Sequence, residues 1–68
     1  MTHFVRIQLQ NRNWNLGPFT SKDSAKEYAD LLVEADPSVI AVPRTTMKNM
    51  TGLLLDPFQF MRKQGYIL

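Results

Sequence analysis

Hydrophobic and polar positions alternate strictly near the start of the chain. Between Phe4 and Gln10 every second residue is aliphatic, namely Val5, Ile7 and Leu9. Such alternation is typical of a strand that buries one face. The polar residues at 11–13 and their neighbours predict a turn, and residues 14–19 predict a second short strand that exits through Gly17–Pro18. This part of the chain is therefore expected to form a β-hairpin.

The segment after the hairpin carries matching signals for the start and end of a helix. Thr20–Ser21 offers an N-cap, Asp23 lies in the first turn, and Pro37 ends a helix that runs to about Ala35. Apolar residues recur at helical spacing in this segment, at Ala25, Tyr28, Ala29 and Leu32. We expect this stripe to pack on the sheet.

A short apolar segment rich in β-branched residues, 38–42, follows the helix and predicts a third strand that Pro43 limits to an edge or an end. A strand that follows such a helix is expected to pair parallel to an earlier strand through a right-handed crossover. Residues 44–52 have no clear period and are predicted to form a loop.

The C-terminal part carries the signals of a short helix. Asp56 is a suitable N-cap, Pro57 suits the first helical position, and Gly65 suits the end of a helix over residues 57–64. Phe58 and Phe60 also alternate as they would in a strand, so periodicity alone leaves both structures open.

The pattern as a whole predicts one α+β domain over residues 1–68 with the order ββαβα. We expect a small, mixed three-stranded sheet that packs against one main helix, with a short C-terminal helix beside it. A chain of 68 residues has a thin core, and without cysteine it has neither disulfides nor thiolate zinc sites to compensate. No apolar run is long enough to span a membrane, and no leader pattern precedes Phe4, so we expect a soluble cytoplasmic protein.

Groups that could carry catalysis are few. The single histidine, His3, lies near the terminus, and the serines fall at cap or turn positions without a neighbouring base. The three glycines are isolated, which excludes a glycine-rich phosphate loop. We therefore expect a chain that is not an enzyme and that needs no cofactor and no metal.

Four carboxylates line one side of the predicted main helix, and we name them the acidic ridge: Asp23, Glu27, Asp30 and Glu34. Their spacing of i, i+4, i+7 and i+11 places them within about 60° of arc, opposite the apolar stripe. One interpretation is a solvated helix face, with Lys26 offsetting part of the repulsion. The other is a docking surface for a basic partner, which would explain why the helix tolerates repulsion between like charges.

The C-terminal segment contains more apolar surface than one sheet can bury. A helix over 57–64 would place Phe58 and Met61 on one side and Phe60 nearly opposite. The segment either closes the core of its own domain or forms a surface for a partner or a second copy. Together with the acidic ridge, the candidate protein-binding residues at this end are Phe58, Phe60, Tyr66 and Leu68.

The basic residues suggest an alternative. Residues 20–35 hold two lysines and four carboxylates, whereas the rest of the chain holds six basic and two acidic residues. A nucleic-acid-binding surface would use cations and amides of the sheet face and loops, with the candidates Arg6, Gln8, Arg12, Arg44 and Lys48.

Two local resemblances accompany these patterns. The stretch Leu16 to Ser21, followed by Ala25, Ala29 and Leu32, resembles the strand-to-helix segment of SPOR peptidoglycan-binding domains and of plant ethylene-response-type DNA-binding domains. Because unrelated classes share it, this segment indicates a hairpin-to-helix junction only. The architecture as a whole resembles the small RNA polymerase inhibitors of bacteriophages, which implies a class of function.

The expected function is that of a small interaction module, an inhibitor or accessory protein such as a phage might encode. It would dock on a larger protein, such as a host enzyme or a component of nucleic-acid machinery, through the acidic ridge or the apolar C-terminal surface. Nucleic-acid binding is the first alternative, and a homo-oligomeric structural protein, with a homodimer as its simplest form, is the second.

Overall fold

The predicted hairpin forms from strands β1 (Thr2–Leu9) and β2 (Arg12–Phe19), which pair antiparallel. The turn between them lies one to two residues earlier than predicted. It consists of Gln10 and Asn11, whose φ angles are 50° and 65°, so both residues adopt the left-handed conformation of a two-residue hairpin turn. Arg12 and Asn13 are polar because they occupy exposed strand positions near the end of the hairpin.

The main helix, α1 (Lys22–Ala35), confirms the prediction at both ends. The hydroxyl oxygen of Ser21 accepts the backbone N–H of Ser24 at 3.1 Å and caps the first turn. At the other end the N–H of Asp36 donates to the carbonyl of Leu32 before Pro37 ends the helix. All four residues of the predicted apolar stripe are buried.

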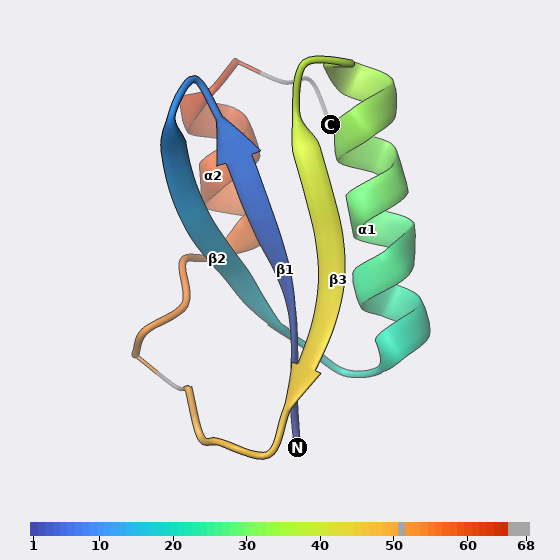
Figure 1. Ribbon diagram of the computed structural model, residues 1–68, viewed down its shortest axis with the longest axis vertical. Helices are drawn as coiled ribbons and strands as arrows, with labels where there is room; N and C mark the ends of the chain where they lie inside the picture. Colours follow the sequence, from blue (N-terminus) through green and yellow to red (C-terminus); the bar gives the residue numbers. More distant parts are fainter. Residues whose placement is uncertain (51, 66–68) are drawn as a thin grey trace.

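Strand β3 (Ile40–Thr46) corrects the predicted pairing. It pairs antiparallel with β1 and not parallel with an earlier strand, so the sheet has the order β2-β1-β3 and is antiparallel throughout. Because both outer strands oppose β1, β2 and β3 run in the same direction, and α1 connects them across the strand that lies between (Figure 1). The strand continues through Pro43, which an edge strand tolerates.

The second helix, α2 (Pro57–Lys63), confirms the helical prediction for this segment. The carboxylate of Asp56 accepts the backbone N–H groups of Phe58 and Gln59 at 2.9 and 3.3 Å. The structure is a computed structural model, and it describes residues 1–50 and 52–65. In Figure 1, α2 lies behind β2, on the same side of the sheet as α1.

The core lies between the sheet and the two helices. Every helix-facing position of β1 from Val5 to Leu9 is buried, as the alternation predicts, and Leu16 of β2 joins them. Phe60 and Met61 of α2 close the core at its end beside β2. The fold is therefore a two-layer α+β domain whose sheet leaves one face without a helix.

The face without a helix, which we call the open face, is covered at one point by the segment before α2. Phe4 lies on this face and is nevertheless buried. A Cβ atom on Gly17 would lie 3.2 Å from the carbonyl oxygen of His3 and 3.3 Å from Cδ1 of Leu54. Gly17 thus permits a close approach of the chain around Leu54 to the sheet beside Phe4.

Candidate interaction surface

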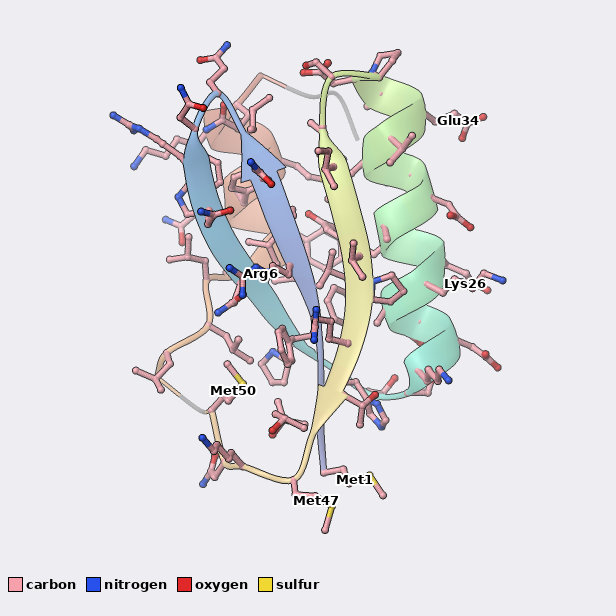
Figure 2. The ribbon with its side chains drawn as sticks, viewed as in Figure 1. Met1, Arg6, Lys26, Glu34, Met47 and Met50 are labelled. Carbon is pink, nitrogen blue, oxygen red and sulfur yellow. The ribbon has the colours of Figure 1, made fainter. Side chains whose placement is uncertain are left out.

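The acidic ridge forms as predicted on the outer side of α1. Its four carboxylates are all exposed, and the buried stripe of the same helix points the other way, toward the sheet. Figure 2 shows Glu34 directed away from the sheet, and the exposed Lys26 also projects from the outer side of the helix. The acidic ridge is therefore a solvent-exposed surface.

A hollow lies beside the ridge, and we name it the aromatic groove after the residues that line it: Phe19, Tyr28, Leu31 and Phe58. These residues come from the end of β2, the middle of α1 and the first turn of α2, so three elements build it. The hollow has a volume of about 330 Å³. Two of its apolar side chains remain largely accessible, with Phe58 exposed by 58% and Leu31 by 44%.

The aromatic rings in the groove hold one another in place. The ring of Tyr28 lies 5.2 Å from that of Phe19 in a tilted arrangement and 6.5 Å from that of Phe58 in an edge-on arrangement. Its hydroxyl donates to the carbonyl oxygen of Pro57 at 2.5 Å, which ties α1 to the start of α2. Burial, and secondly the charge of Asp56, raises the pKa of Tyr28, so the hydroxyl stays protonated and keeps donating.

Carboxylates lie on two sides of this apolar surface. Glu27 belongs to the acidic ridge and also lines the aromatic groove, so the two features meet at this residue. A second hollow shares Phe58 with the groove, is lined in part by Leu54 and Pro57, and contains Asp56. Phe58 therefore lines two hollows, each with an acidic residue at its wall.

The structure separates the predicted C-terminal binding residues. Phe58 is exposed, whereas Phe60 is only 5% exposed and its ring packs 5.2 Å from that of Trp14. The prediction that Phe60 contributes to a binding surface is thus corrected, because its side of α2 faces the sheet. Tyr66 and Leu68 lie outside the described residues.

The candidate nucleic-acid residues are brought together only in part. Arg6 and Gln8 lie next to each other on the open face of β1, as Figure 2 shows for Arg6, and Arg44 of β3 lies opposite Phe4 on the same face. Register places Arg12 on the helix side of the sheet, and Lys48 lies in the loop after β3.

Within residues 1–50 and 52–65 the open face carries no carboxylate, which is its clearest electrostatic property. All six acidic residues of the chain lie on α1, directly after it, or at the cap of α2. In register with Arg6 and Gln8 the face instead presents two amides, Asn15 and Asn13. On the other side of β1, the exposed Val42 and Ile40 of β3 pair with Arg6 and Gln8.

Two further properties concern metals and membranes. Within residues 1–50 and 52–65, no three His, Asp or Glu side chains come together in a group that could hold a metal ion. Neither helix in the described part of the chain has the length and apolar character needed to cross a membrane.

Comparisons of the chain with protein-family models, with curated proteins and with solved structures found no match. Function is therefore inferred from the arrangement of the ridge, the groove and the open face.

Three residues of the aromatic groove, Phe19, Tyr28 and Leu31, were not among the predicted site residues, and Tyr28 was predicted only as part of the apolar stripe that packs on the sheet. Leu31 carries a signal that points to its role, because it is a large apolar residue on α1 outside the buried stripe. Phe19 carries no such signal. It would be expected at the end of an amphipathic strand whether or not a groove formed there.

Proposed function

We propose that this chain is a non-enzymatic interaction module that binds a basic segment of a larger cytoplasmic protein in the aromatic groove, as an inhibitor or accessory protein. The observation that carries the proposal is the meeting of the acidic ridge and the groove at Glu27. An apolar hollow beside several negative charges fits a segment that presents one bulky apolar side chain between lysines or arginines.

The two features would contribute differently to binding. Burial of exposed Phe58 and Leu31 would supply most of the affinity, because desolvated aromatic and aliphatic anchors dominate interface energetics. The carboxylates of the acidic ridge would act mainly on the association rate and on the choice of partner. The bound state would then be sensitive to loss of an apolar side chain and, separately, to reversal of charge.

The chain offers a well-matched pair of variants for a test. Phe58 and Ile40 are large apolar residues with nearly equal exposure, 58% and 57%, but Ile40 lies on the open face, away from the groove. We would immobilise the protein and its variants Phe58→Ser and Ile40→Ser, and capture partners from nuclease-treated lysate of the source organism. Quantitative mass spectrometry would compare the retained proteins.

The proposal expects one basic partner that is retained by the wild type and by Ile40→Ser. The retained amount should fall about tenfold or more with Phe58→Ser. Glu27→Lys should lower retention as well, since it places a cation against the basic segment. Equal retention by all four proteins would remove the groove from the mechanism. Circular dichroism of each variant separates loss of binding from loss of fold.

The second candidate function is nucleic-acid binding by the open face. Among the described residues this face holds no carboxylate, and this absence, together with Arg6, Arg44 and the neighbouring amides, favours nucleic-acid binding. Phe4 offers no ring for stacking because it is buried, so contacts would be made mainly to phosphates.

Nucleic-acid binding has a distinct signature, which is a steep dependence on salt. Fluorescence anisotropy with labelled oligonucleotides should then show affinity falling as salt rises, with the slope reduced by about one for each of Arg6→Gln and Arg44→Gln. Absent binding, or binding that salt does not affect, would dismiss this candidate.

The homo-oligomeric alternative depends on the same exposed apolar side chain. A homodimer would bury Phe58 against a second copy, and the solution mass of the wild type would then be twice that of Phe58→Asp. A monomeric wild type at high concentration would exclude it and leave Phe58 available to a different protein.

A further inference from the structure

A separate pocket lies on the other flank of α2, between this helix and β2. Its volume is about 280 Å³, and it is lined by residues from the start of β2, the segment before α2, and one side of α2. Trp14 and Phe60 form an aromatic wall, with ring centroids 5.2 Å apart and planes inclined by 60°. Phe60 is buried, whereas Trp14 remains partly exposed, so the indole ring is the part of this wall that a ligand can reach.

Two cations lie at the same pocket and come from different elements. Arg12 is the first residue of β2, and Lys63 lies in the last turn of α2. Both side chains are exposed. The amides of Gln59 and Gln64 complete the polar lining. The pocket also contains Asp56, whose carboxylate already accepts two backbone N–H groups as the cap of α2.

We propose that this pocket binds one nucleotide, with its base against Trp14 and its phosphate between Arg12 and Lys63. An indole ring is a good stacking surface for a planar base, and side-chain amides can pair with the polar edges of a base. Arginine and lysine are the usual ligands of phosphate groups. The volume lies at the small end of ligand pockets, which suits a ligand of the size of one nucleotide.

The nucleotide has two sources, a free mononucleotide or one residue of a single strand. Both present the same ring and phosphate to the pocket. They differ in what lies outside it, because a strand has further phosphates that the other basic residues of the surface can attract. This site is independent of the aromatic groove, which lies on the opposite flank of α2 and contains neither cation.

Trp14 provides the probe, because it is the only tryptophan of the chain and gives a single indole N–H signal in a nitrogen–proton correlation spectrum. We would titrate the full chain with adenosine monophosphate, with adenosine, with inorganic phosphate, and with a short oligodeoxyadenylate. The proposal expects a saturable shift of the indole signal with adenosine monophosphate. Adenosine and phosphate, which each lack one half of the ligand, should bind at least about fivefold more weakly.

Charge variants test the phosphate contact. Arg12→Gln and Lys63→Gln should each weaken the binding of adenosine monophosphate about fivefold or more and leave the binding of adenosine unchanged, since only the charge is removed. Lys26→Gln is the control, because Lys26 is an exposed cation on the outer side of α1 that does not line the pocket, and it should have no effect. All three positions are exposed, so these variants are expected to fold.

The titrations give a clear decision. Tighter binding of the oligonucleotide than of the mononucleotide would support the site and identify a single strand as the source, and equal or weaker binding would support the site with a free nucleotide. No saturable shift with either probe would overturn the proposal. A shift that Arg12→Gln and Lys63→Gln leave unchanged would overturn it as well.

Discussion

The two sides of the sheet differ in both packing and charge. The side that faces α1 and α2 contains the core, and beyond the helices it presents the acidic ridge and the aromatic groove. The open face, in the part of the chain that the structure describes, carries no carboxylate and presents arginines, amides and two exposed aliphatic residues of β3. One thin sheet thereby supports two surfaces of opposite character.

This difference shows how a small chain can separate stability from recognition. Side chains that point toward the helices hold the fold together, so few of them can change without cost. The open face and the outer side of α1 are exposed, so their residues can serve a partner with little effect on the fold. The following predictions test that separation, beginning with the largest effect.

The largest effect is expected in the core. Leu32→Ala removes a fully buried side chain between α1 and the sheet and should lower the free energy of unfolding by about 2–5 kcal/mol. Val42→Ala on the open face should change it by less than about 1 kcal/mol. Because a chain of this length has a total stability of roughly 3–10 kcal/mol, Leu32→Ala brings it close to unfolding. Urea denaturation measures both values, and similar costs would contradict the asymmetry of the sheet.

The next effect concerns the point where the chain wraps onto the open face. Gly17→Ala would place a Cβ atom 3.2 Å from the backbone of His3 and 3.3 Å from Leu54, closer than ordinary van der Waals contact. One of these neighbours must move, and we expect a loss of about 1–3 kcal/mol. Gly52→Ala is the control for backbone strain, because alanine is also disfavoured at its φ of 91° whereas no atom lies within 4 Å of that Cβ position. Thermal unfolding of both variants would show whether the close approach at Gly17 matters.

Local signals account for the parts of the fold that the sequence predicts well. The caps at Ser21 and Asp56 and the stops at Pro37 and Gly65 lie within a few residues of the helix ends they define, so both helices are found nearly to the residue. Strand pairing is different, because which strand β3 joins depends on contacts with β1 some 40 positions away in the chain. No local pattern records that choice.

In the candidate site, too, features set by local spacing could be predicted and features set by tertiary packing could not. The acidic ridge is visible in the sequence because helical spacing alone brings its residues together. The aromatic groove is not, since Phe19, Leu31 and Phe58 come from three elements and meet only when the fold is complete. Likewise, periodicity showed that Phe58 and Phe60 lie on different sides of α2, but only packing determined that Phe60 is the buried one.

A smaller effect is expected where the groove is tied to the core. Tyr28→Phe removes the hydroxyl that donates to the carbonyl oxygen of Pro57 and should cost about 0.5–1.5 kcal/mol. The wild type and Tyr28→Phe should also differ in how their stability changes at alkaline pH. The pKa of Tyr28 is raised in the folded state, so its contribution is complete below the unfolded pKa of about 10 and is lost as pH rises above that value.

The alkaline effect is measured as the difference in unfolding free energy between wild type and Tyr28→Phe. That difference isolates Tyr28 from the other groups that titrate in the same range. We expect the advantage of the wild type to shrink above about pH 10. A difference that stays constant with pH would mean that Tyr28 is not shielded from solvent by the groove.

The smallest effect is expected at the hairpin turn, which belongs to neither surface. Asn11 has a φ of 65°, a conformation that glycine adopts without steric cost, and glycine is the preferred second residue of this turn type. Asn11→Gly relieves this conformation but also increases the freedom of the unfolded chain, so it should raise the free energy of unfolding by about 0.5 kcal/mol or less. The turn contributes no side chain to the aromatic groove or to the pocket beside Trp14, so partner capture and nucleotide titration should stay unchanged. If stability and binding rose together in this variant, recognition would depend on the rigidity of the whole sheet, and the separation between the two sides would fail.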